Sequence, residues 1–97
     1  MSVARTYRMQ AAEGKADELR AALIALAEAV RPLNGCEQVD LMEDSDRAGA
    51  FLFIERWQSV DAHKAGGAQL PKGVFGPVMG ALAQPPESAW MACLVKA

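Results

Sequence analysis

The chain has 97 residues, of which 52% are apolar and 23% charged, and its formal net charge is −2 at pH 7. This length predicts a single domain over residues 1–97, because folded domains commonly contain about 100–150 residues. The slightly acidic balance argues against nucleic acid or an anionic membrane as a partner, since both bind to basic surfaces.

The chain shows no signal for a membrane or a secretory pathway. Its longest uncharged run, residues 73–86, has 14 residues, whereas a bilayer-spanning helix needs about 20 apolar residues. The N-terminal region lacks a basic segment followed by an apolar stretch, so we expect a cytoplasmic protein. Cys36 and Cys93 are predicted to be free thiols. With a single histidine in the chain, no metal site of Cys and His ligands is expected.

Two elements are predicted in the first third of the chain. Residues 2–9 alternate larger side chains with smaller or polar ones, which is typical of a strand. A long amphipathic helix is predicted next, with Leu19, Leu23, Leu26 and Val30 on its apolar face. The helix should end at Pro32, and Asn34-Gly35 predicts a turn.

Two strands and a short helix are expected in the middle of the chain. Residues 36–43 alternate apolar and polar side chains, which predicts a half-buried strand. Residues 50–57 are apolar on both alternating sets, which is typical of a central strand covered on both faces. Ser59 is a favourable N-cap for a short helix that extends to Lys64.

The last third of the chain is less regular. Residues 65–80 contain five of the eight glycines and two of the five prolines. A second helix is expected within them, with an apolar side formed by Val74, Phe75, Val78, Met79 and Leu82. Residues 88–96 alternate again and predict a final strand.

This order of elements, β-α-β-β-α-β, predicts the ferredoxin-like α+β fold, a four-stranded antiparallel sheet with both helices on one face. The expected strand order is 4-1-3-2, with Cys36 and Cys93 at opposite edges. The second face of such a sheet is bare in a monomer, although the third strand is apolar on both faces. We therefore expect a homodimer formed through the open sheet face.

Three short motifs resemble the antibiotic biosynthesis monooxygenase family of dimeric α+β barrels. The first is Gly-Lys-Ala-Asp-Glu-Leu at residues 14–19, which opens the first helix, and the second is Gly35-Cys36 after that helix. The third is Glu55-Arg56-Trp57 at a strand end, followed six residues later by His63. The resemblance covers nearly the whole chain. After His63 it weakens, because a run rich in glycine and proline replaces the more regular helix of many members.

The resemblance implies oxygenation of a quinol-like or polyketide-like aromatic substrate by O2 with no flavin, haem or metal cofactor. A deprotonated phenol or carbon acid can pass an electron to O2 itself, so the protein need supply only a base, donors for the oxyanion and a dry pocket. Some relatives degrade haem with an asparagine on the first strand and a tryptophan in the second helical region. This chain has neither residue at those places, which disfavours haem degradation.

The candidate catalytic residues are His63, Trp57 and Tyr7. His63 is the one side chain whose ordinary pKa lies near neutrality, and we interpret it as the base. Trp57 could wall an aromatic substrate and Tyr7 could donate to an oxyanion. The candidate substrate-binding residues are Phe53, Phe75 and Met79. For each candidate, a purely structural role as core or as a hydrogen-bonding group remains an alternative.

Other interpretations stay open at this point. The strand arginines Arg5, Arg8 and Arg56 either point into a cavity or reach across the dimer to an acid such as Glu55 or Asp40, and the ion-pair interpretation is favoured. The same fold hosts unrelated functions, so a non-catalytic dimeric module that binds a small ligand, or only has a structural role, is one alternative. An isomerase or decarboxylase that uses the same histidine and pocket is another.

Overall fold

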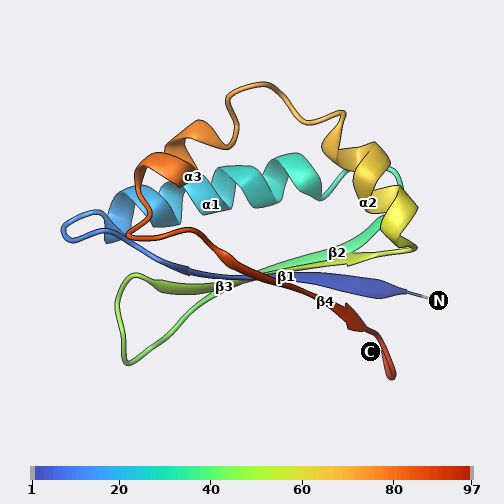
Figure 1. Ribbon diagram of the computed structural model, residues 1–97, viewed down its shortest axis with the longest axis horizontal. Coiled ribbons are helices and arrows are strands. Elements are labelled where there is room, and N and C mark those ends of the chain that lie inside the picture. The colour runs from blue at the N-terminus through green and yellow to red at the C-terminus, as the bar shows by residue number, and fades with distance from the viewer. Residues whose placement is uncertain (1, 97) are drawn as a thin grey trace.

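The computed structural model describes residues 2–96. Three helices lie on one side of a four-stranded antiparallel sheet, and the other side of the sheet carries no helix (Figure 1). In chain order the elements are β1 (Val3–Gln10), α1 (Ala16–Val30), β2 (Cys36–Glu43), β3 (Ala50–Trp57), α2 (Val60–Gly67), α3 (Gly76–Gly80) and β4 (Glu87–Ala92).

The strand order is β2-β3-β1-β4, as predicted for the ferredoxin-like arrangement. In the antiparallel register Tyr7 lies opposite Phe53, and Arg5 lies between Glu55 on β3 and Trp90 on β4. Directly paired residues point to the same face of a sheet. Alternate residues of β1, β3 and β4 therefore face the helices together, and this alternation determines which side chains can meet in a site.

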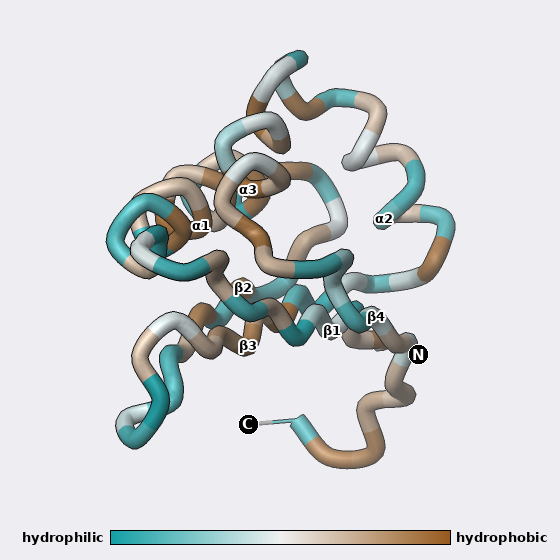
Figure 2. The backbone as a smooth tube through the Cα atoms, turned by 60° about the vertical axis from the view of Figure 1, so that its left-hand side comes forward, coloured by the Kyte–Doolittle hydropathy of each residue, from teal (hydrophilic) through white to brown (hydrophobic). Residues whose placement is uncertain are grey.

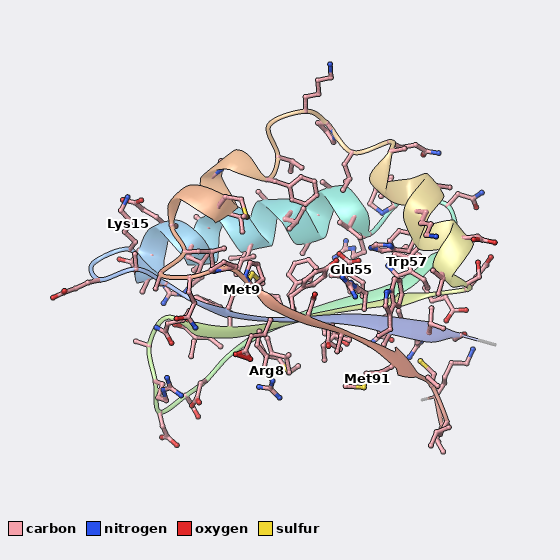
Figure 3. The ribbon with its side chains drawn as sticks, viewed as in Figure 1. Arg8, Met9, Lys15, Glu55, Trp57 and Met91 are labelled. Carbon is pink, nitrogen blue, oxygen red and sulfur yellow. The ribbon has the colours of Figure 1, made fainter. Side chains whose placement is uncertain are left out.

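The hydrophobic core lies between α1 and the sheet. All four predicted helix residues, Leu19, Leu23, Leu26 and Val30, are buried. They face Met9, Phe51, Phe53 and Trp57 of the central strands. Side chains at residues 3 and 4 apart share one side of a helix, so a single apolar stripe covers the sheet. Figure 3 shows Met9, Glu55 and Trp57 between the sheet and the helices, whereas Arg8 and Met91 point away from the helices.

The turn after α1 depends on Gly35. Its backbone φ is +88°, and a Cβ at this position would lie 2.7 Å from the Cβ of Ala62 in α2. Both the positive φ and the close approach favour glycine. The Gly35 carbonyl also accepts a hydrogen bond from the Gln58 backbone N–H at 2.9 Å. This bond joins the turn that precedes β2 to the residues that precede α2.

Two predictions in the last third of the chain are wrong in extent. The predicted second helix is reduced to the five residues of α3, in which Val78 is buried but Met79 is exposed, and Phe75 precedes the helix. The final strand ends at Ala92 and not at residue 96. Ala92 pairs with Val3 at the start of β1, and Cys93 donates one further backbone hydrogen bond to Ser2. Beyond this point β1 offers no further partner.

The segment after β4 is apolar and exposed. Leu94 and Val95 have 89% and 92% of their surface accessible. Figure 2 shows this hydrophobic segment on the side of the sheet opposite the helices. None of the helices within residues 2–96 is long and apolar enough to cross a membrane.

Candidate active site

A cavity of about 260 Å³ lies between the helix-facing side of the sheet and the helices. Side chains from β1, α1, β3, α2, α3 and the segment between the last two helices line it. Of these lining residues, three have titratable side chains, namely Tyr7, Glu55 and His63, and the others are almost all apolar. A mostly apolar pocket with a few convergent polar groups is the usual form of a small-molecule site.

The structure brings all six residues proposed from the sequence to this one cavity. Tyr7 comes from β1, Phe53 and Trp57 from β3, His63 from α2, and Phe75 and Met79 from the region of α3. Phe53 and Trp57 are fully buried and form the floor, while Phe75 and Met79 are about half exposed. The six residues thus extend from the floor of the cavity to its mouth.

Glu55 also lines the cavity, whereas from the sequence it was a motif residue with only an ion-pair role predicted. Its side chain is 5% exposed. The indole Nε1 of Trp57 donates a hydrogen bond to Glu55 Oε1 at 3.0 Å, and His63 Nε2 lies 3.7 Å from the same oxygen. The alternation of β3 carried the signal, because residue 55 shares a face with Phe51, Phe53 and Trp57.

The surroundings shift the acidity of these groups in opposite directions. Burial raises the pKa of Glu55, opposed by the hydrogen bond from Trp57 and by the positive charge of Arg5. Burial lowers the pKa of His63, and the charge of Arg5 lowers it further. The two pKa values therefore move toward one another, so that a neutral imidazole stands beside a carboxylate that is more basic than an exposed one. Such a pair can accept one proton from a bound molecule.

Two aromatic rings hold the imidazole in place. The ring centroid of His63 lies 5.4 Å from that of Trp57 and 4.9 Å from that of Trp90, with both pairs edge to face. Trp90 was not among the residues proposed from the sequence. Its position on the last strand and the pairing of that strand with the first were predicted, but its contact with His63 depends on the register of the two strands, which alternation alone does not specify.

Arg5 lies next to this cluster without a carboxylate partner. Its guanidinium carbon is 4.9 Å from the ring centroid of Trp90 and 5.3 Å from that of Tyr7. Pairing of the strand arginines with Glu55 or Asp40 across a dimer stays a prediction. Within residues 2–96 of one subunit, Arg56 pairs with Glu37 at 3.2 Å, and neither Arg5 nor Arg8 forms an ion pair.

Helix α2 brings His63 to the cavity through two local features. The side chain of Ser59 accepts a hydrogen bond from the backbone N–H of Ala62 at 3.0 Å, which is the predicted N-cap. At the other end, Gly66 allows the helix to lie directly on Trp57, since a Cβ there would be 2.7 Å from the Cη2 atom of that ring.

A second hollow lies near the loop between β2 and β3. It has a volume of about 460 Å³, and charged residues such as Arg8, Arg47, Asp44 and Glu87 line it. None of the candidate residues is there, and its charges are exposed to solvent. No group of three or more His, Cys, Asp or Glu side chains that could hold a metal ion occurs in the part of the chain that the structure describes.

The profile of the family described as "Antibiotic biosynthesis monooxygenase" matches residues 2–65, about two thirds of the sequence. The chain belongs to this family. The match includes the catalytic candidates Tyr7, Trp57 and His63, and also Glu55. Phe75 and Met79 lie beyond it, in the region where the motifs weaken.

Several solved structures of similar proteins have the same fold as this chain. Rv0793 from Mycobacterium tuberculosis is 26% identical, with a TM-score of 0.83, and the alignment covers 100% of this chain and 99% of that one. A protein from Chloroflexus aurantiacus, provisionally assigned to the same family, is 22% identical with a TM-score of 0.84 and coverage of 100% and 97%.

A further similar structure is SnoaB from Streptomyces nogalater, described as a cofactor-independent oxygenase. It is 16% identical with a TM-score of 0.83, and the alignment covers 98% of this chain and 95% of that one. No curated protein matches the sequence of this family member significantly.

Proposed function

We propose that this protein is a cofactor-independent monooxygenase that oxidises a small quinol-like or polyketide-like aromatic substrate with O2. The observation that carries the proposal is the Glu55–His63 pair, with its 3.7 Å separation, at the floor of an otherwise apolar cavity. Oxygenation without a cofactor begins with removal of a proton from the substrate, and this pair is placed to accept it.

The proposed reaction balances without an external reductant. The pair takes a phenolic proton, and the resulting phenolate passes one electron to O2, which gives a substrate radical and superoxide. Their recombination forms a carbon–oxygen bond and a hydroperoxide. Loss of the ring proton with cleavage of the O–O bond leaves one oxygen atom in the product as a carbonyl group. The other oxygen leaves as water, and the substrate supplies all four electrons.

The cavity supports a small, apolar and aromatic substrate. Its volume of about 260 Å³ is close to the lower end of the range for small-molecule pockets, about 300–1,000 Å³. Trp57 and Phe53 offer aromatic surfaces at the floor, and Phe75 and Met79 cover the mouth. The resemblance of the fold to SnoaB, a cofactor-independent oxygenase, agrees with this chemistry.

The proposed assembly is a homodimer of one-domain subunits in the cytoplasm. The open face of the sheet carries half-buried Leu52 and Ile54 at its centre, with exposed Met42 and Met91 on the two edge strands. A second copy that covers this face would remove these apolar side chains from water. Both cysteines are free thiols, which suits a reducing compartment.

The test is oxygen uptake by the purified protein, in the presence of a chelator, with a panel of hydroquinones and anthrone-like phenols. We expect protein-dependent uptake above autoxidation, with one water formed per O2 consumed. His63→Ala should lower turnover at least tenfold without loss of fold, and Arg47→Ala serves as a control in the second hollow. Absence of uptake over the whole panel would contradict the oxygenase proposal and favour a ligand-binding module or a non-oxidative enzyme.

A further inference from the structure

Arg5 is a half-buried cation that forms no ion pair within residues 2–96. It lies on the helix-facing side of β1, and its guanidinium is stacked between the rings of Tyr7 and Trp90. Its Nη2 atom donates to Ser88 Oγ at 3.2 Å, a neutral acceptor, and its Nε atom is buried with no hydrogen-bond partner among the described residues. A guanidinium that is partly removed from water is stabilised by a nearby anion.

Arg5 does not itself line the cavity, but its charge acts on two groups that do: it opposes the rise in the pKa of Glu55 and lowers the pKa of His63. Glu55 is its direct cross-strand partner, and Tyr7 is two residues away on the same face, so both flanking side chains line the cavity. The other strand arginines differ from Arg5 in this respect. Arg56 is paired with Glu37, and Arg8 points away from the helices (Figure 3).

We propose that Arg5 supplies the positive charge that holds the substrate as an anion, and that the substrate class is therefore a phenol or enol acidic enough to bind in its ionised form. This inference rests on the proposed function, because it assigns the charge that must be present when the substrate loses its proton. It adds a residue that neither the motifs nor the family match singles out.

Proton transfer in the cavity conserves the local charge. Before transfer the site contains the Arg5 cation, the Glu55 carboxylate and a neutral phenol. After transfer Glu55 is neutral and the phenolate carries the negative charge, so the Arg5 cation remains compensated. A fixed cation that is already oriented stabilises the anion without reorganisation, and guanidinium groups stacked on aromatic rings are well suited to this role.

The positive charge of Arg5 also implies a preference among substrates. A molecule of the same shape that cannot ionise leaves the negative charge on Glu55 and gains nothing from the charge of Arg5. We therefore expect ionisable phenols to be selected over their methyl ethers. This preference belongs to binding and does not depend on O2.

The experiment uses 4-nitrophenol, which O2 does not oxidise and whose ionised form has its own absorption band. It is bound to the protein at a pH about one unit below the pKa of the free phenol, where roughly one molecule in ten is ionised in solution. We expect the ionised fraction of the bound ligand to be several-fold higher in the wild type. Arg5→Met should return it to the solution value, whereas Arg8→Met, on the same strand but the opposite face, should leave it high.

A second ligand, 4-nitroanisole, shows whether the cavity is intact, because it has a similar shape and cannot ionise. Arg5→Met should bind it as the wild type does. If Arg5→Met does not fold, Arg5→Gln replaces it. An ionised fraction in the wild type no higher than in solution, including no binding of 4-nitrophenol, would overturn the inference. So would an equal fraction in the wild type and the Arg5 variant.

The two proposals fail in different ways in these experiments. Absence of oxygen uptake with a raised ionised fraction would contradict the oxygenase and leave the anion site standing. Oxygen uptake without a raised ionised fraction would support the oxygenase and contradict the anion site.

Discussion

Glu55 is a carboxylate in a place where an apolar side chain would pack well. It is 5% exposed and lies between Phe53 and Trp57 on the helix-facing side of β3. Its one short hydrogen bond comes from the Trp57 indole. Burial of a charged group with few partners lowers stability, so this residue illustrates how a site can be kept at the expense of the fold.

The first prediction concerns pH. The pair must be unprotonated to act as a base, so oxygen uptake should fall as the pH decreases through its apparent pKa. The pKa of Glu55 is raised above its ordinary 4.5 and that of His63 is lowered below its ordinary 6.5. We therefore expect the acidic limb of kcat/KM to have its midpoint between these two values. A midpoint above 6.5 would show that these two groups do not control the reaction.

The second prediction separates activity from stability at Glu55. Glu55→Gln keeps an acceptor for Trp57 but removes the base, so oxygen uptake should fall by about a hundredfold. Because the pKa of Glu55 is raised in the folded state, its carboxylate costs stability as the pH rises through that value. The variant should therefore be more resistant to urea than the wild type at pH 7, by a margin that disappears below pH 4. Equal resistance at pH 7 would contradict the assigned burial effect.

The third prediction compares two adjacent glycines. In Gly66→Ala the new Cβ would meet the Trp57 ring at 2.7 Å, so the protein should lose about 1–3 kcal/mol of unfolding free energy through overpacking. Gly67→Ala is the matched control, because nothing lies within 4 Å of its Cβ position and alanine is the better helix former. Urea unfolding of both variants measures the difference. Equal midpoints would mean that α2 does not lie on Trp57 as described.

The sequence allowed much of the site to be predicted at the level of single residues, but not its charges. Tyr7, Trp57 and His63 were recognisable from strand alternation and from the motif that ends in the helical histidine, and all three line the cavity. For Glu55 the sequence predicts only an ion pair, because alternation does not show that a cavity lies against its face of β3. The relation of Arg5 to Trp90 depends on the register of β1 and β4. Periodicity excludes a slip of one residue but does not distinguish registers that differ by two.

At the scale of elements, the first two thirds of the chain agree with prediction and the last third does not. The bounds of β2 and β3 are those expected, since their patterns are regular and turns flank them. Between residues 65 and 80, glycine and proline reduce the predicted helix to the five residues of α3, because both lower helix propensity. The apolar pattern there did not distinguish a long helix from a loop whose side chains cover a cavity.

The fourth prediction concerns the N-cap of α2. Ser59→Ala removes the acceptor for the Ala62 N–H and should cost about 1 kcal/mol in unfolding free energy. Since this helix carries His63, frayed N-terminal turns should also raise KM for the aromatic substrate. Ser59→Asn keeps a capping oxygen and should behave as the wild type does. Loss of stability in the asparagine variant as well would indicate a role for Ser59 other than capping.

At the scale of the whole molecule, the two faces of the sheet are unequal. Helices cover one face, while Leu52 and Ile54 on the other are only half-buried beside exposed Met42 and Met91. The fifth prediction is that Leu52→Asp places a charge in the proposed dimer interface and converts a dimer into a monomer. Ile24→Asp, on the exposed side of α1, is the control and should remain dimeric. Sedimentation at micromolar concentration distinguishes these states, and a monomeric wild type would contradict the interface.

The segment between α2 and α3, residues 68–75, lies against the cavity and is held by local backbone hydrogen bonds. Its backbone N–H groups at Ala68, Gln69, Leu70 and Val74 all donate to carbonyls no more than four residues away, so its backbone bonds to the end of α2 and to itself and to no strand of the sheet. Leu70 and Phe75 shape the cavity from this segment, while the base and the core lie on the regular elements. Substitutions at Leu70 or Phe75 would therefore change which molecules fit the cavity, while Glu55 and His63 keep their places on β3 and α2. The range of substrates can therefore change without substitutions at Glu55, Trp57 or His63.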